Sequence, residues 1–170
     1  NIGLGTRVIT GAQIQRYYIT DTPSQGNVIY INDQNKPGLS SKREQEVSNP
    51  RIVLQRITGV DSKVRIISTL INGHMYCANS TNYIANDNSI NIKYLLGVLN
   101  SSLVNFFIKQ TSTNTNITAK VLNSIPIIFP STKMQEAIIR IVDYVLIIKS
   151  LPSDIIIDQY VDNDVMARQF

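Results

Sequence analysis

One amphipathic stretch, KYLLGVLNSSLVNFFIKQ at residues 93–110, constrains the fold of this chain most. Its large apolar residues recur at steps of four, four and three, namely Leu95, Leu99, Leu103 and Phe106. That spacing gathers them on one side of an α-helix, and Asn91 can cap its start, so we predict a helix over residues 91–110. Gly97 inside the helix costs about 1 kcal/mol relative to alanine. We therefore expect a tight packing contact at Gly97, where another backbone comes close.

A second helix is predicted over residues 132–150. Thr132 and Gln135 have the spacing of a capping box, and Pro152 ends the helical pattern. Apolar residues at helical spacing cover a wide face: Met134, Ile138, Ile139, Ile141, Val142, Val145, Leu146 and Ile148. We therefore expect this helix to be buried on much of its surface.

Runs of β-branched and aromatic residues between turn signals predict short strands. The runs are residues 7–10, 16–20, 28–31, 51–58, 63–69, 74–78, 81–85 and 121–129. We expect residues 16–31 to form a hairpin and residues 51–85 to form an antiparallel meander. Pro126 places the run at 121–129 on a sheet edge or at a bulge. Residues 154–168 have the pattern of a strand or a short helix.

These elements predict an α+β fold with a mixed, mostly antiparallel sheet, hairpins, and two long helices over about residues 91–110 and 132–150. Residues 32–49 contain only two aliphatic side chains, so we expect a long surface loop there, with a short helix at 41–47.

The length of 170 residues suffices for one domain with its own core, and we expect residues 1–170 to form a single domain. The sequence begins with Asn1 rather than Met, which suggests a C-terminal fragment of a larger protein. No apolar run has the length of a membrane span, and no secretory signal is visible. Cys77 is the sole cysteine, so no disulfide framework is expected. We therefore expect a cytoplasmic protein without a membrane partner.

The net charge of +4 is unevenly distributed along the chain. Residues 1–120 hold 12 Lys and Arg against 6 Asp and Glu, whereas residues 121–170 hold 4 against 6. A basic front section favours a polyanionic partner such as nucleic acid. The alternative is an ordinary solvated surface, which a charge of this size also fits.

Catalytic chemistry has little support in the sequence. His74 is the sole histidine, it lies in a predicted strand without a nearby acid, and no residue is marked as a nucleophile. The pair Gly3 and Gly5 lacks the third glycine and the strand-to-helix context of a dinucleotide site. We therefore predict no catalytic residue and no metal site in this chain.

Several segments between Tyr94 and Lys149 occur in an informative order. They are LLGVLNSSLVNFFIKQ, a polar loop, LNSIPIIFP and MQEAIIRIVDYVLIIK, and a looser match through PRIVLQRIT and NSTNYIAND extends back to Pro50. In this order the segments resemble the C-terminal part of TaqI-like specificity domains. Specificity subunits of type I restriction systems share the ending of an Ile-Pro strand followed by a Gln-rich helix, so they are a close rival.

The resemblance implies the target-recognition part of a bacterial adenine-N6 DNA methyltransferase or of a fused type II restriction-modification enzyme. It implies two partners, double-stranded DNA and a missing methyltransferase domain. S-adenosylmethionine is then the expected cofactor of that missing domain, and no cofactor is expected in this chain. The Asp/Asn-Pro-Pro-aromatic tetrapeptide of adenine methyltransferases is absent, and Asn49-Pro50-Arg51 is the nearest stretch.

The candidate DNA-binding residues are cations for phosphates and polar side chains for base edges. They are Lys42, Arg43, Gln55, Arg56, Lys63, Arg65, Lys109, Thr113, Asn114, Asn116 and Lys120. For any one of them, an ordinary solvent-facing role is the alternative. We expect the polar loop at residues 111–120 and the hairpin at 56–65 to lie at the same end of the sheet and to face DNA together. Outside the DNA-binding class, a protein-interaction domain whose helices dock a partner remains an alternative function.

Overall fold

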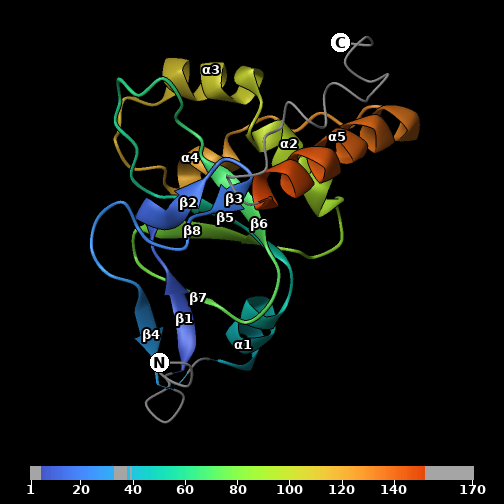
Figure 1. Ribbon diagram of the computed structural model, residues 1–170. Helices are drawn as coiled ribbons and strands as arrows, with labels where there is room; N and C mark the ends of the chain where they lie inside the picture. The colour runs from blue at the N-terminus through green and yellow to red at the C-terminus, as the bar shows by residue number, and fades with distance from the viewer. Residues whose placement is uncertain (1–4, 33–37, 39, 152–170) are drawn as a thin grey trace.

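The computed structural model describes residues 5–32, 38 and 40–151, and it confirms the predicted α+β fold class (Figure 1). The strands are β1 Thr6–Ile9, β2 Ile14–Gln15, β3 Tyr18–Ile19, β4 Ile29–Ile31, β5 Arg51–Gln55, β6 Ser68–Ile71, β7 Tyr76–Cys77 and β8 Thr81–Ala85. The helices are α1 Ser41–Ser48, α2 Ile92–Leu99, α3 Ser102–Thr111, α4 Ala119–Asn123 and α5 Thr132–Ser150, with a short 3-10 helix η1 at Gly11–Gln13. The segment predicted at 154–168 lies outside the described residues. Within them, no helix is long and apolar enough to cross a membrane.

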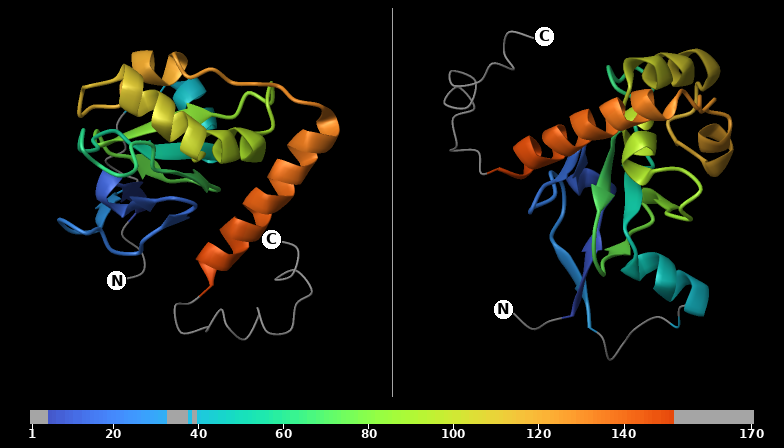
Figure 2. Two further views of the ribbon diagram at one scale, coloured as in Figure 1. Left: turned by 90° about the horizontal axis from the view of Figure 1, so that it is seen from above. Right: turned by 90° about the vertical axis from the view of Figure 1, so that its right-hand side faces the viewer.

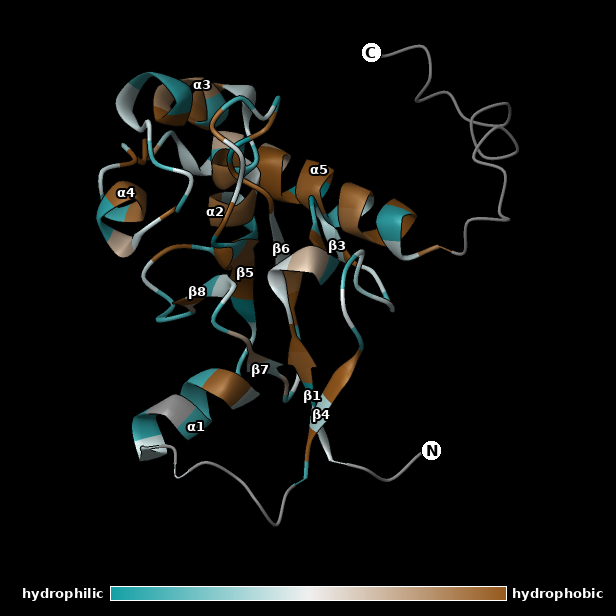
Figure 3. Cartoon of the chain, turned by 90° about the vertical axis from the view of Figure 1, so that its left-hand side faces the viewer, coloured by the Kyte–Doolittle hydropathy of each residue, from teal (hydrophilic) through white to brown (hydrophobic). Residues whose placement is uncertain are grey.

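Strand β5 lies at the centre of the antiparallel sheet β6-β5-β8. Ile52, Val53 and Leu54 are all fully buried because both faces of the sheet are covered. Ile52 and Leu54 belong to the larger apolar cluster, which includes buried residues of α2, α3 and α5. Val53 points the other way, into a smaller cluster with Ile9 and Ile14 from the N-terminal strands. Figure 3 shows the resulting apolar band through β5 and α2.

The pairing of the N-terminal strands differs from the predicted hairpin at 16–31. Strand β4 pairs antiparallel with β1 instead, and β2 forms a tight hairpin with β3. Strand β7 is also not part of the predicted meander. It pairs in parallel with β1, whereas β8 pairs with β5. The expectation for these partners was wrong because strand pairing depends on contacts between residues far apart in sequence. Alternation within a strand carries no information about its partner.

The helical region predicted at 91–110 is interrupted once, which makes it two helices, α2 and α3. At the break, the buried Asn100 side chain accepts from the Ser68 backbone N–H at 3.3 Å and donates to the Ser68 carbonyl at 2.9 Å. Ser101 then caps α3 by accepting from the backbone N–H of Val104 at 3.2 Å. Helix α2 therefore ends at Leu99, where the Asn100 side chain bonds to the backbone of strand β6. Asn91 caps α2 as predicted.

The strand predicted at 121–129 is absent, and that expectation was wrong. The hydroxyl of Thr118 accepts from the Val121 backbone N–H at 3.3 Å, which starts the short helix α4 at Ala119. The chain then continues past Pro126 without regular structure until α5. The Thr118 cap therefore favours a helix in this segment, although its apolar residues have a preference for strands.

Helix α5 has the predicted bounds, and Figure 2 shows it extending away from the rest of the fold. The predicted capping box of Thr132 and Gln135 is wrong, because Ser131 is the N-cap and makes no side-chain cap bond. The helix is also far less buried than expected. Val142 is its one fully buried residue, and Ile141, Tyr144 and Ile147 are each more than half exposed. The helix packs chiefly against α2. The close contact predicted at Gly97 is present, although its partners are side chains: a Cβ added there would lie 2.9 Å from methyl carbons of Ile138 and Val142.

Candidate functional site

The two segments predicted to act together, residues 56–65 and residues 111–120, lie side by side where β5 ends (Figure 1). We call them together the rim. The backbone N–H of Ile117 donates to the Arg56 carbonyl at 2.7 Å, and that of Thr58 donates to the Thr115 carbonyl at 2.9 Å. These bonds flank a bridge between Ile57 and Asn116, so the rim is a short antiparallel ladder. The predicted proximity of the two segments is confirmed.

Arg65 joins the two segments from inside the protein. Its side chain is fully buried and donates to the Ser112 carbonyl at 3.2 Å, to the Thr58 hydroxyl at 3.3 Å and to the Asn114 carbonyl. All of these acceptors are neutral, and the guanidinium makes no ion pair with any of the described residues. The prediction that Arg65 faces DNA is therefore wrong in its geometry: the side chain shapes the loop and is not available to a ligand.

Asn105 on α3 fixes the other side of the rim. Its carbonyl oxygen accepts from the Arg65 backbone N–H at 2.6 Å, and its amide nitrogen donates to the Lys63 carbonyl at 3.0 Å. This clamp holds residues 63–65 away from strand geometry, which explains why β6 begins only at Ser68 rather than at the predicted residue 63. The sequence pattern did not identify Asn105, because a single Asn on a helix has many possible roles.

Four cations are exposed on or beside the rim: Arg56, Lys63, Lys109 and Lys120. Arg56 donates to the Asn79 carbonyl at 3.2 Å, which directs its guanidinium along the surface. Lys109 follows Asn105 by one helical turn and so lies on the same side of α3 as the clamp. Asp61 is the one acidic residue in segments 56–65 and 109–120. The rim therefore presents a positive surface.

Some polar side chains predicted to read bases are exposed, whereas others are buried or hydrogen-bonded within the protein. Thr113 and Asn114 are exposed. The Asn114 side-chain oxygen accepts from the Asn116 backbone N–H at 2.9 Å, and its amide N–H groups make no hydrogen bond within the described part of the chain. Asn116 is half-buried in the ladder. Gln55 differs from the prediction, because its amide donates to the Ile14 carbonyl at 2.7 Å and thereby joins β5 to β2.

The remaining predicted cations, Lys42 and Arg43, lie in α1 and are not brought to the rim. The Arg51 side chain donates to the Val47 carbonyl at 2.5 Å, which fixes α1 at the start of β5, whereas the rim follows its end. Five strand residues separate the two by about 17 Å. The Arg43 side chain lies outside the described part of the structure. Figure 1 shows α1 at the opposite end of the molecule from the rim, and Lys42 is an exposed residue of this helix.

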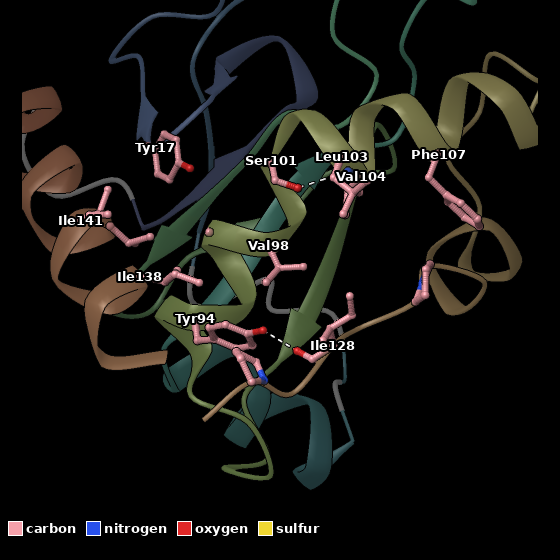
Figure 4. Close-up of a pocket in the computed structure, with 14 residues that line it drawn as sticks. Tyr17, Tyr94, Val98, Ser101, Leu103, Val104, Phe107, Ile128, Ile138 and Ile141 are labelled. Carbon is pink, nitrogen blue, oxygen red and sulfur yellow. Dashed lines mark hydrogen bonds between the residues drawn. The ribbon is translucent and has the colours of Figure 1, made fainter. Parts of the chain in front are cut away.

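A second feature is an apolar groove between α2, α3 and α5, with a volume of about 510 Å³ (Figure 4). Its walls include Val98, Leu103, Phe107, Ile138 and Ile141. Two of its polar groups are already hydrogen-bonded: the Tyr94 hydroxyl donates to the Ile128 carbonyl, and the Ser101 hydroxyl caps α3. The groove therefore offers contact to apolar groups. No cluster of His, Cys, Asp and Glu suited to a metal ion occurs among the described residues.

Residues 6–127 match the family of TaqI-like C-terminal specificity domains, and the chain belongs to that family. Both segments of the rim lie within the matched residues, whereas α5 lies beyond them, although the sequence resemblance extended to Lys149. No curated protein matches the chain. At the level of the family, the chain is a specificity domain of the kind that gives DNA-modifying enzymes their target recognition.

Proposed function

We propose that this chain binds double-stranded DNA in a sequence-specific manner, as the target-recognition domain of an adenine-N6 methyltransferase in a restriction-modification system. The single observation that carries the proposal is the rim, where exposed cations surround a loop of Thr and Asn side chains held in a fixed shape. Family membership supports the same function.

The rim carries two kinds of group for a DNA duplex, cations for the phosphates and polar side chains for the base edges. Lys63, Lys109 and Lys120 contact phosphates and supply affinity that is independent of sequence. Thr113 and Asn114 carry donors and acceptors that match base edges, and Asn pairs with adenine through two hydrogen bonds. The buried Arg65 keeps these groups in register, so that little ordering is required when DNA binds.

In this proposal, methyl transfer belongs to a separate catalytic domain that binds S-adenosylmethionine. The target adenine must leave the base stack to be methylated, so the recognition domain holds the distorted duplex while the catalytic domain acts on the base. Placement of the parent enzyme in the bacterial cytoplasm follows from the same proposal.

A salt titration of DNA binding tests this function. We expect the affinity of the 170-residue chain for duplex DNA to fall steeply as salt increases, because each phosphate contact releases condensed counterions. Replacing both Lys63 and Lys120 by Gln should lower the slope of log affinity against log salt by about 2. Lys42→Gln is the matched control, because its cation lies at the other end of the molecule. Binding that is insensitive to salt, or a slope unchanged by the rim variants, would overturn the proposal.

A second candidate function, docking of a protein partner, is favoured by the apolar groove and the exposed face of α5. Leu103, Phe107 and Ile141 line the groove, and Leu103 and Ile141 are more than half exposed. Association through such a surface buries apolar area and depends little on salt. The salt titration therefore also separates the two functions. The missing methyltransferase domain is the partner that the first proposal would place in this groove.

A further inference from the structure

A second pocket, of about 490 Å³, lies beside the rim. It shares Tyr17 with the apolar groove but is otherwise lined by more polar residues. It is open to solvent and is bordered by the β2–β3 hairpin, by the segment before β6 and by the C-terminal end of α5. Its walls include two tyrosines and two cations, namely Tyr17, Tyr18, Arg16 and Lys149. Val64 also lines it, and Val64 is a residue of the rim itself.

Each of the two cations in this cavity lies over the ring of one of the two tyrosines. The guanidinium carbon of Arg16 lies 5.8 Å from the centre of the Tyr17 ring, and the Lys149 Nζ lies 5.5 Å from that of the Tyr18 ring. Arg16 also donates to the Asn100 carbonyl, which leaves its other N–H groups available. Each ring therefore has a cation over one of its two faces. A base that stacks on the other face would have its phosphate within reach of a positive charge.

The hairpin that forms this cavity is strained. Tyr17 has a φ of 70° in a two-residue turn, a position where glycine or asparagine is usual. The conformation is held because the Tyr17 backbone N–H donates to the Ser68 carbonyl at 3.0 Å and its ring packs against the larger apolar cluster. A large side chain in a strained turn is a feature associated with binding sites, and here it gives a rigid aromatic wall.

Gln15 adds a polar group to the same cavity. It lies on β2, is half-buried, and its side-chain amide makes no hydrogen bond within the described part of the chain. An amide of this type can pair with the edge of a base. Lys149 and Val145 lie beyond the residues that match the family, so the cavity includes a part of the chain that the family match does not cover.

We propose that this cavity receives one unstacked nucleotide of the bound DNA. The base stacks on Tyr18, its edge faces Gln15, and its phosphate lies between Arg16 and Lys149. The inference rests on the proposed DNA-binding function, because the nucleotide reaches the cavity from a duplex held on the adjacent rim. It adds a base-binding pocket that is distinct from the groove-facing loop at residues 111–120.

The test compares the affinity of the 170-residue chain for two duplexes of the same sequence, one fully paired and one with a single bulged adenine. We expect the bulged duplex to bind roughly ten-fold more tightly, the effect of one stacked base. Tyr18→Leu and Lys149→Gln should each bring the ratio of the two affinities close to one. The matched controls are Tyr144→Leu and Lys133→Gln, which change the same residue types elsewhere on α5 and should keep the ratio.

The outcomes separate this proposal from the proposed function. Salt-dependent binding of both duplexes with equal affinity would overturn the cavity proposal and leave DNA recognition by the rim intact. A preference for the bulged duplex that survives both cavity variants would place the nucleotide elsewhere and would also overturn the proposal. Absence of binding to either duplex would overturn both. Thermal unfolding of each variant checks that any change in ratio comes from a folded protein.

Discussion

The rim and the α5 side of the molecule differ in how they are held together. The rim consists of polar loops, yet its shape is fixed by a backbone ladder, by the Asn105 clamp and by the buried Arg65 guanidinium. Helix α5 is regular and apolar, yet it meets the body chiefly through α2 and leaves much of its apolar surface in water. The irregular rim is therefore held by more specific contacts than the regular helix α5. Buried hydrogen bonds fix the irregular region, which suits it to precise recognition.

The largest effect is expected from removing the charge under the rim. Arg65→Met keeps the apolar stem but leaves the Ser112 and Asn114 carbonyls and the Thr58 hydroxyl without their donor. We expect the free energy of unfolding to fall by about 2–4 kcal/mol, measured by urea denaturation. Arg56→Met is the control, because Arg56 is exposed and should change stability by only about 0.5 kcal/mol. Equal effects of the two variants would show that Arg65 does not hold the rim.

The next effect concerns the selectivity of the loop rather than its stability. Asn114→Ala removes an exposed amide and one hydrogen bond inside the loop. We expect the free-energy difference between a preferred duplex and a scrambled one to shrink by roughly 1–3 kcal/mol, measured by competition binding. Asn72→Ala changes an exposed loop residue outside the rim and should leave the discrimination unchanged. If both variants discriminate like the parent chain, Asn114 does not read a base.

A smaller effect is expected where α5 meets α2. Gly97→Ala places a methyl group 2.9 Å from Ile138 and Val142, so the helices must separate. The gain in helix propensity partly offsets the overpacking, and a net loss of about 1–2 kcal/mol remains. Hydrogen exchange should become faster in α5 and stay unchanged in residues 111–118. Faster exchange in both regions would mean that the two sides of the molecule are coupled.

The smallest effect is expected from the ion pair between Lys93 and Asp143, whose charged atoms lie 2.5 Å apart. Both side chains are more than a third exposed, so water and salt weaken the pair. Lys93→Gln should lower stability by no more than about 1 kcal/mol, and the difference should disappear in high salt. A loss that persists in high salt would mean that the contact acts through packing rather than charge.

The sequence predicts those parts of the molecule that depend on local periodicity. The bounds of α5, the Asn91 cap and the close contact at Gly97 follow from spacing within a few residues. The proximity of the two rim segments was also predicted correctly, although the argument for it was only partly right. Leu103 and Phe106 of the predicted apolar face are more than half exposed, and α3 is anchored through Val104 and Ile108 instead.

Other parts depend on which distant residues meet, and local patterns did not predict them. Arg65 alternates with apolar neighbours like a surface strand residue, and only the fold reveals the three acceptors around it. Asn100 interrupts the predicted helix because Ser68 lies beside it, 32 residues away in sequence. The pairing of β1 with β4 and β7 is likewise set by tertiary contacts.

The central claim is that the rim is the DNA-binding surface, and hydrogen exchange of the 170-residue chain with and without excess duplex DNA tests it most directly. We predict that DNA slows exchange in residues 56–65 and 111–120, and leaves α1 and the N-terminal half of α5 unchanged. Protection confined to α5 and the walls of the apolar groove, with an unchanged rim, would contradict the claim.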